Sequence, residues 1–111
     1  MQPLERKAAI AAYKARPPAF GVFAVIREAT GDVWVGKSRH LDTEMNGLWF
    51  ALSLGRSPYR SLQAAWTAHG QTAFRFEELE RLREDFPKLT LMDELKKRQA
   101  LWRVRLKAEA L

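Results

Sequence analysis

Hydrophobic residues in the first third of the chain gather in two short stretches. Two short apolar, β-prone runs lie within residues 21–25 and 32–35, and the turn between them contains Thr30 and Gly31. Glycine adopts a positive φ at no steric cost, which a tight turn requires. Two such runs joined by a glycine turn form an antiparallel hairpin. We therefore predict that residues 21–25 pair with residues 32–35.

Helical periodicity follows the hairpin. Apolar residues recur every three or four positions in three segments, which predicts helices over residues 41–52, 62–69 and 91–107. Asp42 or Thr43 can cap the first of these helices, and Gly55 is well placed to end it.

The remaining segments complete the predicted fold. Residues 4–16 are rich in good helix formers and are ended by Pro17-Pro18, while Phe74 and Phe76 alternate with polar residues as in a strand. The predicted fold class is therefore α/β. We expect one small domain with about three strands in a mostly antiparallel sheet flanked by helices. An N-terminal helix and proline linker would occupy residues 1–19, and the domain residues 20–111.

Composition and charge indicate which kinds of partner the protein can bind and which kinds of chemistry it lacks. The 111 residues are 47% hydrophobic and 11% aromatic, enough to bury a core, and the formal net charge is +6. Such a surplus attracts polyanions, so DNA bound with little sequence specificity is the expected partner, although basic surfaces also aid solubility. The chain has no cysteine, which excludes disulfides and thiolate chemistry. No apolar run is long enough for a membrane span, and we expect a cytoplasmic protein.

Short motifs on the hairpin are followed by a series of landmarks in a fixed order. The motifs are Gly21-Val22-Phe23 and Trp34-Val35-Gly36, and the landmarks are Gly55, Leu62-Gln63, Trp66, Gly70 and Phe74-Arg75-Phe76-Glu77. In this order they resemble the GIY-YIG nuclease superfamily, over roughly residues 21–106.

The resemblance implies metal-dependent cleavage of a DNA phosphodiester bond, with Mg²⁺ or Mn²⁺ as cofactor. In the family a second-strand tyrosine helps to activate the nucleophile, a first-helix arginine neutralises the phosphate, and a glutamate on a later helix holds the metal. This division of roles suits a transition state in which negative charge builds up on phosphate oxygens.

The sequence departs from that set at each expected position. Phe23 and Trp34 replace the motif tyrosines, and neither side chain can act as a base. The expected arginine falls on Glu44, which would repel a phosphate, and the expected glutamate falls on Lys97. Phe23 and Trp34 are nevertheless catalytic candidates, because they occupy the motif positions.

Neighbouring residues offer substitutes. Arg39 is a further catalytic candidate, since it can reach a phosphate, and Glu94 is the candidate metal ligand one helical turn from Lys97. Tyr59 is the nearest tyrosine after the hairpin. The candidate nucleic-acid-binding residues are Lys37, Arg39, Lys96, Lys97 and Arg98.

Each of these patterns also has a purely structural explanation. The basic run at residues 96–98 can be a solvated helix face, with Glu94 and Arg98 as an ion pair four residues apart. The four tryptophans are more typical of a core than of base-stacking platforms. Two functions therefore remain open: a DNA endonuclease with weak or lost catalysis, and a non-catalytic nucleic-acid or protein interaction module.

Overall fold

A computed structural model describes residues 19–111, so the helix predicted before Pro17-Pro18 lies outside the described residues. The elements in chain order are β1 (Gly21–Arg27), β2 (Asp32–Ser38), α2 (Leu41–Ser53), α3 (Arg60–His69), the 3-10 turn η1 (Gln71–Ala73), β3 (Phe74–Arg81), α4 (Lys88–Leu106) and β4 (Glu109–Ala110). The α/β class predicted from the sequence is confirmed.

The predicted hairpin is present. Strands β1 and β2 pair antiparallel, with Val25 opposite Trp34. Gly31 has a φ of +75°, and its N–H donates to the carbonyl of Arg27 at 2.9 Å. The glycine turn therefore sets the register of the two strands.

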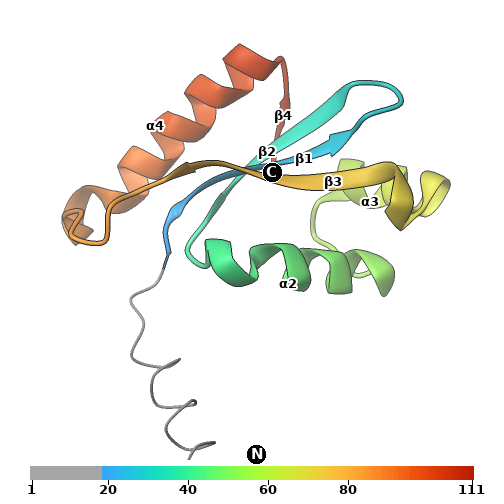
Figure 1. Ribbon diagram of the computed structural model, residues 1–111, viewed down its shortest axis with the longest axis horizontal. Helices are drawn as coiled ribbons and strands as arrows, with labels where there is room; N and C mark the ends of the chain where they lie inside the picture. The colour runs from blue at the N-terminus through green and yellow to red at the C-terminus, as the bar shows by residue number, and fades with distance from the viewer. Residues whose placement is uncertain (1–18) are drawn as a thin grey trace, which may run out of the picture.

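The sheet contains one strand more than the sequence indicated. The strand order is β3-β1-β2-β4, and β4 runs parallel to β2, with Glu109 beside Trp34. Figure 1 shows β4 descending from the end of α4 to reach β2. The expectation of about three mostly antiparallel strands is thus corrected to a four-stranded mixed sheet. A strand of two residues carries no periodic signal that sequence could reveal.

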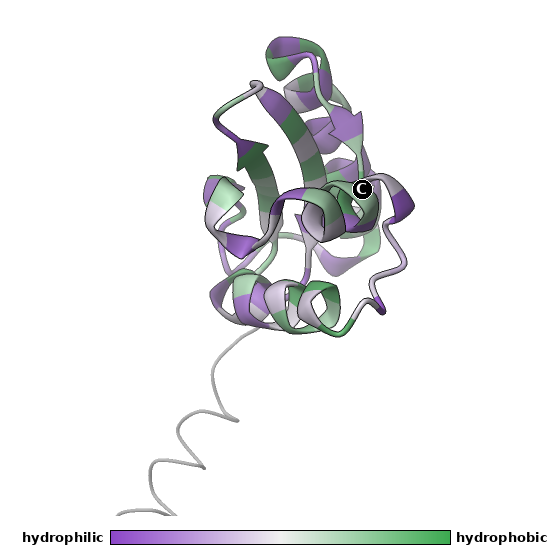
Figure 2. Cartoon of the chain, turned by 90° about the vertical axis from the view of Figure 1, so that its right-hand side faces the viewer, coloured by the Kyte–Doolittle hydropathy of each residue, from purple (hydrophilic) through white to green (hydrophobic). Residues whose placement is uncertain are grey.

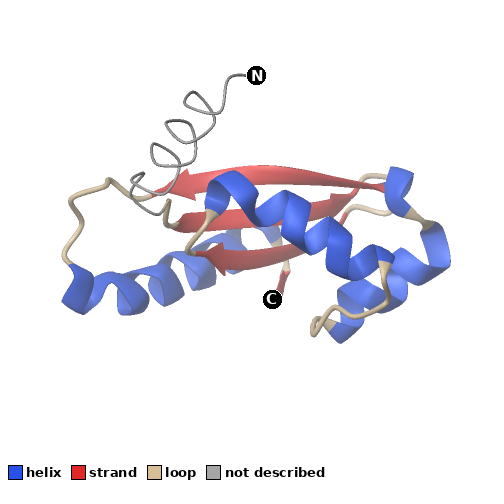
Figure 3. Ribbon diagram, turned by 90° about the horizontal axis from the view of Figure 1, so that it is seen from below, coloured by secondary structure: helices blue, strands red, loops and turns tan. Residues whose placement is uncertain are grey.

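Helices cover both faces of the sheet, with α4 on one side and α2 and α3 on the other (Figure 1). The alternation of β1 divides its side chains between two cores. Phe23 and Val25 join the core under α2 and α3, while Val22 and Ala24 pack toward Trp102 of α4. Hydrophobic residues are accordingly concentrated on the central strands (Figure 2), which lie side by side in Figure 3.

Helix α2 begins at Leu41 as predicted, but its cap differs from the prediction. Its N-cap is His40, and neither Asp42 nor Thr43 caps it. The N–H of Leu41 donates instead to the carbonyl of Ala19 at 2.9 Å, so the segment entering β1 satisfies that first helical donor. The end of α2 is as predicted, since Gly55 follows it with a φ of +71°.

The predicted apolar stripe of α4 and the core role of the tryptophans are confirmed. On α4, Leu91 and Leu95 are buried. Trp34 and Trp66 are buried, and Trp49 and Trp102 pack against the cores while partly exposed. Among the described helices, none has the length and hydrophobicity needed to cross a membrane.

Candidate functional site

The first motif position is enclosed by the core. Phe23 is fully buried, and its ring stacks on Phe76 at a centroid distance of 5.1 Å. The ring also covers Gly36, the glycine of the second motif. Packing therefore explains why position 36 is a glycine and why position 23 carries a ring. Phe23 offers no polar group to a substrate.

Trp34 occupies the second motif position and is the first donor in a short chain of hydrogen bonds. Its ring is buried at 5% exposure, and its Nε1–H donates to Ser61 Oγ at 3.1 Å. The Ser61 hydroxyl in turn donates to the Glu109 carboxylate at 2.6 Å. Strands β2 and β4 and the first turn of α3 thus meet at this point.

A second polar contact lies on the α4 side of the same sheet edge. Gln99 is buried, and its Nε2 donates to the carbonyls of Val35 at 2.8 Å and Leu111 at 3.0 Å. Lys37 donates to Gln99 Oε1 at 3.5 Å. Lys37, a predicted DNA contact, is therefore partly buried and turned toward α4.

The two proposed substitutes, Arg39 and Glu94, make contacts with different partners. Arg39 is exposed and donates to the sulfur of Met92 at 3.5 Å. Glu94 accepts from Arg98 Nε at 2.7 Å, and Arg98 also pairs with Glu80. The ion pair between Glu94 and Arg98 considered from the sequence is thus present.

Glu44, at the expected arginine position, lies in a cluster at the start of α2. Burial raises the pKa of the Glu44 carboxyl, while the Ser38 hydroxyl bonded to it and nearby His40 partly oppose that shift. Burial and the charge of Glu44 also raise the pKa of Tyr59. Tyr59, the N-cap residue of α3, therefore stays protonated at neutral pH and can donate a hydrogen bond.

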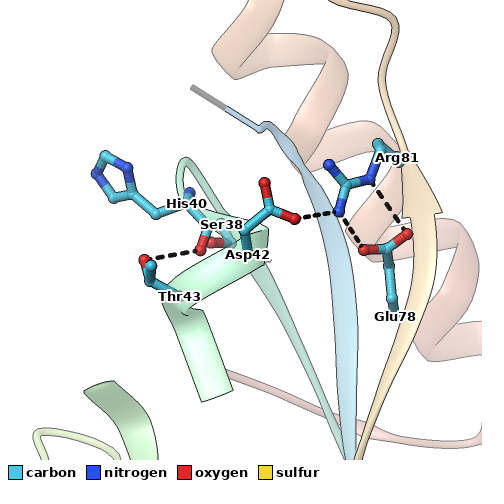
Figure 4. Close-up of polar contacts among 6 residues, drawn as sticks. All are labelled: Ser38, His40, Asp42, Thr43, Glu78 and Arg81. Atoms are coloured by element: carbon cyan, nitrogen blue, oxygen red, sulfur yellow. Dashed lines mark hydrogen bonds and ion pairs between the residues drawn. The ribbon is translucent and has the colours of Figure 1, made fainter. Parts of the chain in front are cut away.

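Ion pairs and hydrogen bonds fix the start of α2 relative to β3. Figure 4 shows Asp42 accepting from Arg81, which also binds Glu78, and Ser38 close to His40. The Arg81–Asp42 distance is 2.8 Å, and the His40 N–H donates to Ser38 Oγ at 2.9 Å. The Glu44 cluster is therefore built on a fixed framework.

The predicted basic residues on α4 divide into two kinds. Lys96 and Lys97 are exposed, and neither enters an ion pair within residues 19–111. Arg98 is held between Glu80 and Glu94. The two lysines are available to a polyanion, whereas Arg98 has carboxylate partners already.

The described side chains form no ready-made cluster of magnesium ligands. In residues 19–111 no three His, Asp or Glu side chains gather as metal ligands. The one proposed ligand, Glu94, is already neutralised by Arg98. Magnesium is held by oxygen ligands that face it directly, so Arg98 would have to release Glu94 before this carboxylate could serve.

Three polar residues at this sheet edge were not identified from the sequence: Ser61, Gln99 and Glu109. Each lies far along the chain from the β2 residue that it approaches, directly or through another side chain. The sequence offered one signal for Gln99, which lies four residues after Leu95 and therefore on the apolar stripe of its helix. A glutamine buried at such a position needs hydrogen-bond partners.

Sequence comparison identifies no relative: no family model matches the chain, and no curated protein matches it. Structural comparison identifies a similar fold. The catalytic domain of homing endonuclease I-TevI superposes with a TM-score of 0.69 at 19% identity, covering 83% of this chain and 97% of that one. A mutant of the catalytic domain of intron endonuclease I-TevI gives 0.67 at 19% identity, covering 80% of this chain and 84% of that one. That domain is a GIY-YIG nuclease, and the chain described here has the GIY-YIG nuclease fold.

Proposed function

We propose that this chain binds DNA and has weak or no phosphodiester cleavage activity. The observation that carries the proposal is the enclosure of the two motif rings. Phe23 is 0% exposed and Trp34 is 5% exposed, so neither presents a nucleophile-activating group to a phosphate. The fold resembles that of an endonuclease, but activity depends on the site.

The other expected positions support the same conclusion. A carboxylate at Glu44 opposes the negative charge of a phosphate, and a cation at Lys97 repels a metal ion. Losing one electrostatic group of this kind commonly lowers a rate by about 100- to 1000-fold. Several such losses together leave little catalysis unless Arg39, Glu94 or Tyr59 compensates.

DNA binding is supported by charge and by its distribution. The net charge is +6, and Lys96 and Arg103 are seven positions apart in α4, a spacing that places them on one side of the helix. Contacts between such residues and phosphates release counterions, so affinity should fall steeply as salt rises. Replacing Lys96 and Lys97 together by Gln should weaken binding and lower the salt slope by about two. Replacing Arg75, which is already paired with Glu77, should change the DNA affinity and the salt slope much less.

The test of cleavage is a nicking assay on supercoiled plasmid with Mg²⁺ or Mn²⁺, against a sample containing a chelator. We expect no metal-dependent nicking above background. Robust nicking would contradict the proposal and would point to the substitute residues. In that case Glu94→Ala and Arg39→Ala should each abolish nicking without unfolding the protein, as measured by circular dichroism.

A non-catalytic protein-binding module is the second candidate, favoured by exposed apolar residues at the C-terminal end of α2. Phe50 and Leu54 lie one helical turn apart and are 68% and 53% exposed. Absence of DNA binding at low salt, together with loss of a protein contact on Phe50→Ser, would favour this candidate over the first.

A further inference from the structure

The outer edge of β2 is covered by the last four residues of the sequence, 108–111, here called the C-terminal strap. Only Trp34 and Val35 of β2 pair with it. The backbone of the strap is held by Leu111 N–H donating to the Val35 carbonyl at 2.9 Å and by Gln99. Both paired residues of the strap, Glu109 and Ala110, are exposed.

The turn that leads into the strap is conformationally strained. Lys107 has φ 53° and ψ 48°, the one positive φ at a non-glycine residue in the part of the chain that the structure describes. A side chain with a Cβ disfavours this left-handed conformation. The strap therefore leaves α4 through a residue whose backbone conformation is unfavourable, and relaxing this residue would lower the free energy of a state in which the strap has left β2.

The Glu109 carboxylate is the terminal acceptor of the hydrogen-bond chain from Trp34 through Ser61. Because Ser61 Oγ accepts the indole N–H, its own proton is directed at Glu109, over a distance of 2.6 Å. Donation from Trp34 also polarises the hydroxyl and strengthens it as a donor. The chain thus ends in a donor directed at an anion.

Two basic residues are neighbours in sequence of the two residues that form this hydrogen bond. Arg60 precedes Ser61 and is exposed, and Lys107 lies two residues before Glu109. Neither is in an ion pair within residues 19–111. A phosphate oxygen has the same preference for a hydroxyl donor and nearby cations as the carboxylate that lies there.

We propose that Glu109 acts as an internal competitor for a DNA phosphate at Ser61, so that the C-terminal strap is autoinhibitory. This inference rests on the proposed DNA binding. When DNA binds, the strap leaves β2, a phosphodiester oxygen accepts from Ser61, and Arg60 and Lys107 face the phosphate. The exchange replaces an intramolecular acceptor by an intermolecular one and leaves the Ser61 donor satisfied.

The test is fluorescence anisotropy of a labelled DNA duplex titrated with wild-type protein and with Glu109→Gln. Glutamine keeps the shape of the side chain but removes the charge that competes with phosphate. We expect Glu109→Gln to bind DNA about tenfold more tightly, the effect of a charged hydrogen bond. Glu84→Gln removes the same charge from an exposed position in the turn between β3 and α4 and should tighten binding by about twofold.

Ser61→Ala distinguishes a phosphate contact from a general charge effect. Added to Glu109→Gln, it should remove most of the gain in affinity if the phosphate uses the Ser61 hydroxyl. The indole N–H resonance of Trp34, followed by NMR, should shift on adding DNA to wild-type protein. Circular dichroism would verify that each variant is folded.

Three outcomes distinguish failure of the proposed competition by Glu109 from failure of the proposed DNA binding. Equal gains for Glu109→Gln and Glu84→Gln, with no shift of the Trp34 resonance, would overturn the competition while leaving DNA binding in place. Binding by Glu109→Gln alone would support autoinhibition in its strongest form. No binding by any variant at low salt would refute the proposed DNA binding and the competition with it.

Discussion

The ring of Phe23 lies so close over Gly36 that a Cβ on Gly36 would be 2.4 Å from Phe23 Cζ. One residue comes from each motif of the hairpin, and the two face each other across β1 and β2. The close packing requires that position 36 has no side chain, because real Cβ atoms do not approach other atoms so closely.

Gly36→Ala should therefore destabilise the protein, by about 1–3 kcal/mol, as the Phe23 ring is forced from its position. Denaturant unfolding followed by tryptophan fluorescence would measure the change. Gly47→Ala is the matched control, because nothing lies within 4 Å of the added Cβ in the middle of α2. It should stabilise the protein by up to about 1 kcal/mol. Equal effects of the two substitutions would contradict this packing.

Restoring a tyrosine at the first motif should not restore cleavage. Phe23→Tyr places a hydroxyl on a ring that is 0% exposed, and burying an unpaired hydroxyl costs about 1–3 kcal/mol. We expect a lower melting temperature and no gain in plasmid nicking. Phe50→Tyr, on a ring that is 68% exposed, should leave the melting temperature unchanged within error. Metal-dependent nicking by Phe23→Tyr would show that the site is accessible after all.

Gln99→Leu should destabilise the protein by about 1–3 kcal/mol, because it removes two donors to the carbonyls of Val35 and Leu111. The same substitution at exposed Lys97 should change the free energy of unfolding by no more than about 0.5 kcal/mol. Hydrogen exchange would add a second measurement, since the Leu111 N–H should exchange faster in Gln99→Leu. Unchanged exchange would mean that Gln99 does not hold the strap.

Glu44→Gln should stabilise the protein at neutral pH. Since burial raises the pKa of the Glu44 carboxyl, the folded state binds its proton more tightly than the unfolded state. Stability of the wild type therefore falls as pH rises through the folded pKa, a cost that glutamine avoids. Melting temperatures should favour the variant at about pH 7, and the gap should close toward about pH 4. A gap that widens on acidification would give the pKa shift the opposite sign.

Lys107→Gly should stabilise the native state by about 1 kcal/mol, since glycine accepts the left-handed conformation that Lys107 adopts at φ 53°. Arg105→Gly, two residues earlier inside α4, should instead destabilise it by about 1 kcal/mol. Thermal unfolding of both variants would separate the two effects. Destabilisation by both would indicate that the turn after α4 is not strained.

Local features of the chain were predictable, because they depend on residues close in sequence. Gly31 determined the hairpin turn, and Gly55 the end of α2, each through a positive φ that neighbouring residues cannot easily adopt. The first residue of α2 was predicted correctly but its cap was not, since the carbonyl that satisfies Leu41 belongs to Ala19, more than twenty positions earlier.

The polar residues of the β2 edge could not be predicted for a related reason. Ser61 and Glu109 are ordinary exposed residues in sequence, and only the folded sheet brings them to Trp34. The only sequence feature that distinguishes Gln99 is its position among apolar residues on one side of its helix. Pairwise contacts of this range leave no periodic pattern in a single sequence. The motif substitutions at Phe23 and Trp34 were visible directly, whereas their burial required the structure.

The parallel pairing of β4 with β2 also has a kinetic consequence. More than seventy residues separate Trp34 from Glu109, so this contact closes a very long loop and should form late in folding. Until it forms, the outer edge of β2 presents unpaired N–H and C=O groups beside Val33 and Val35. An open strand edge of this kind is a template for pairing with other chains. A folding intermediate that lacks β4 should therefore be the species most prone to aggregate.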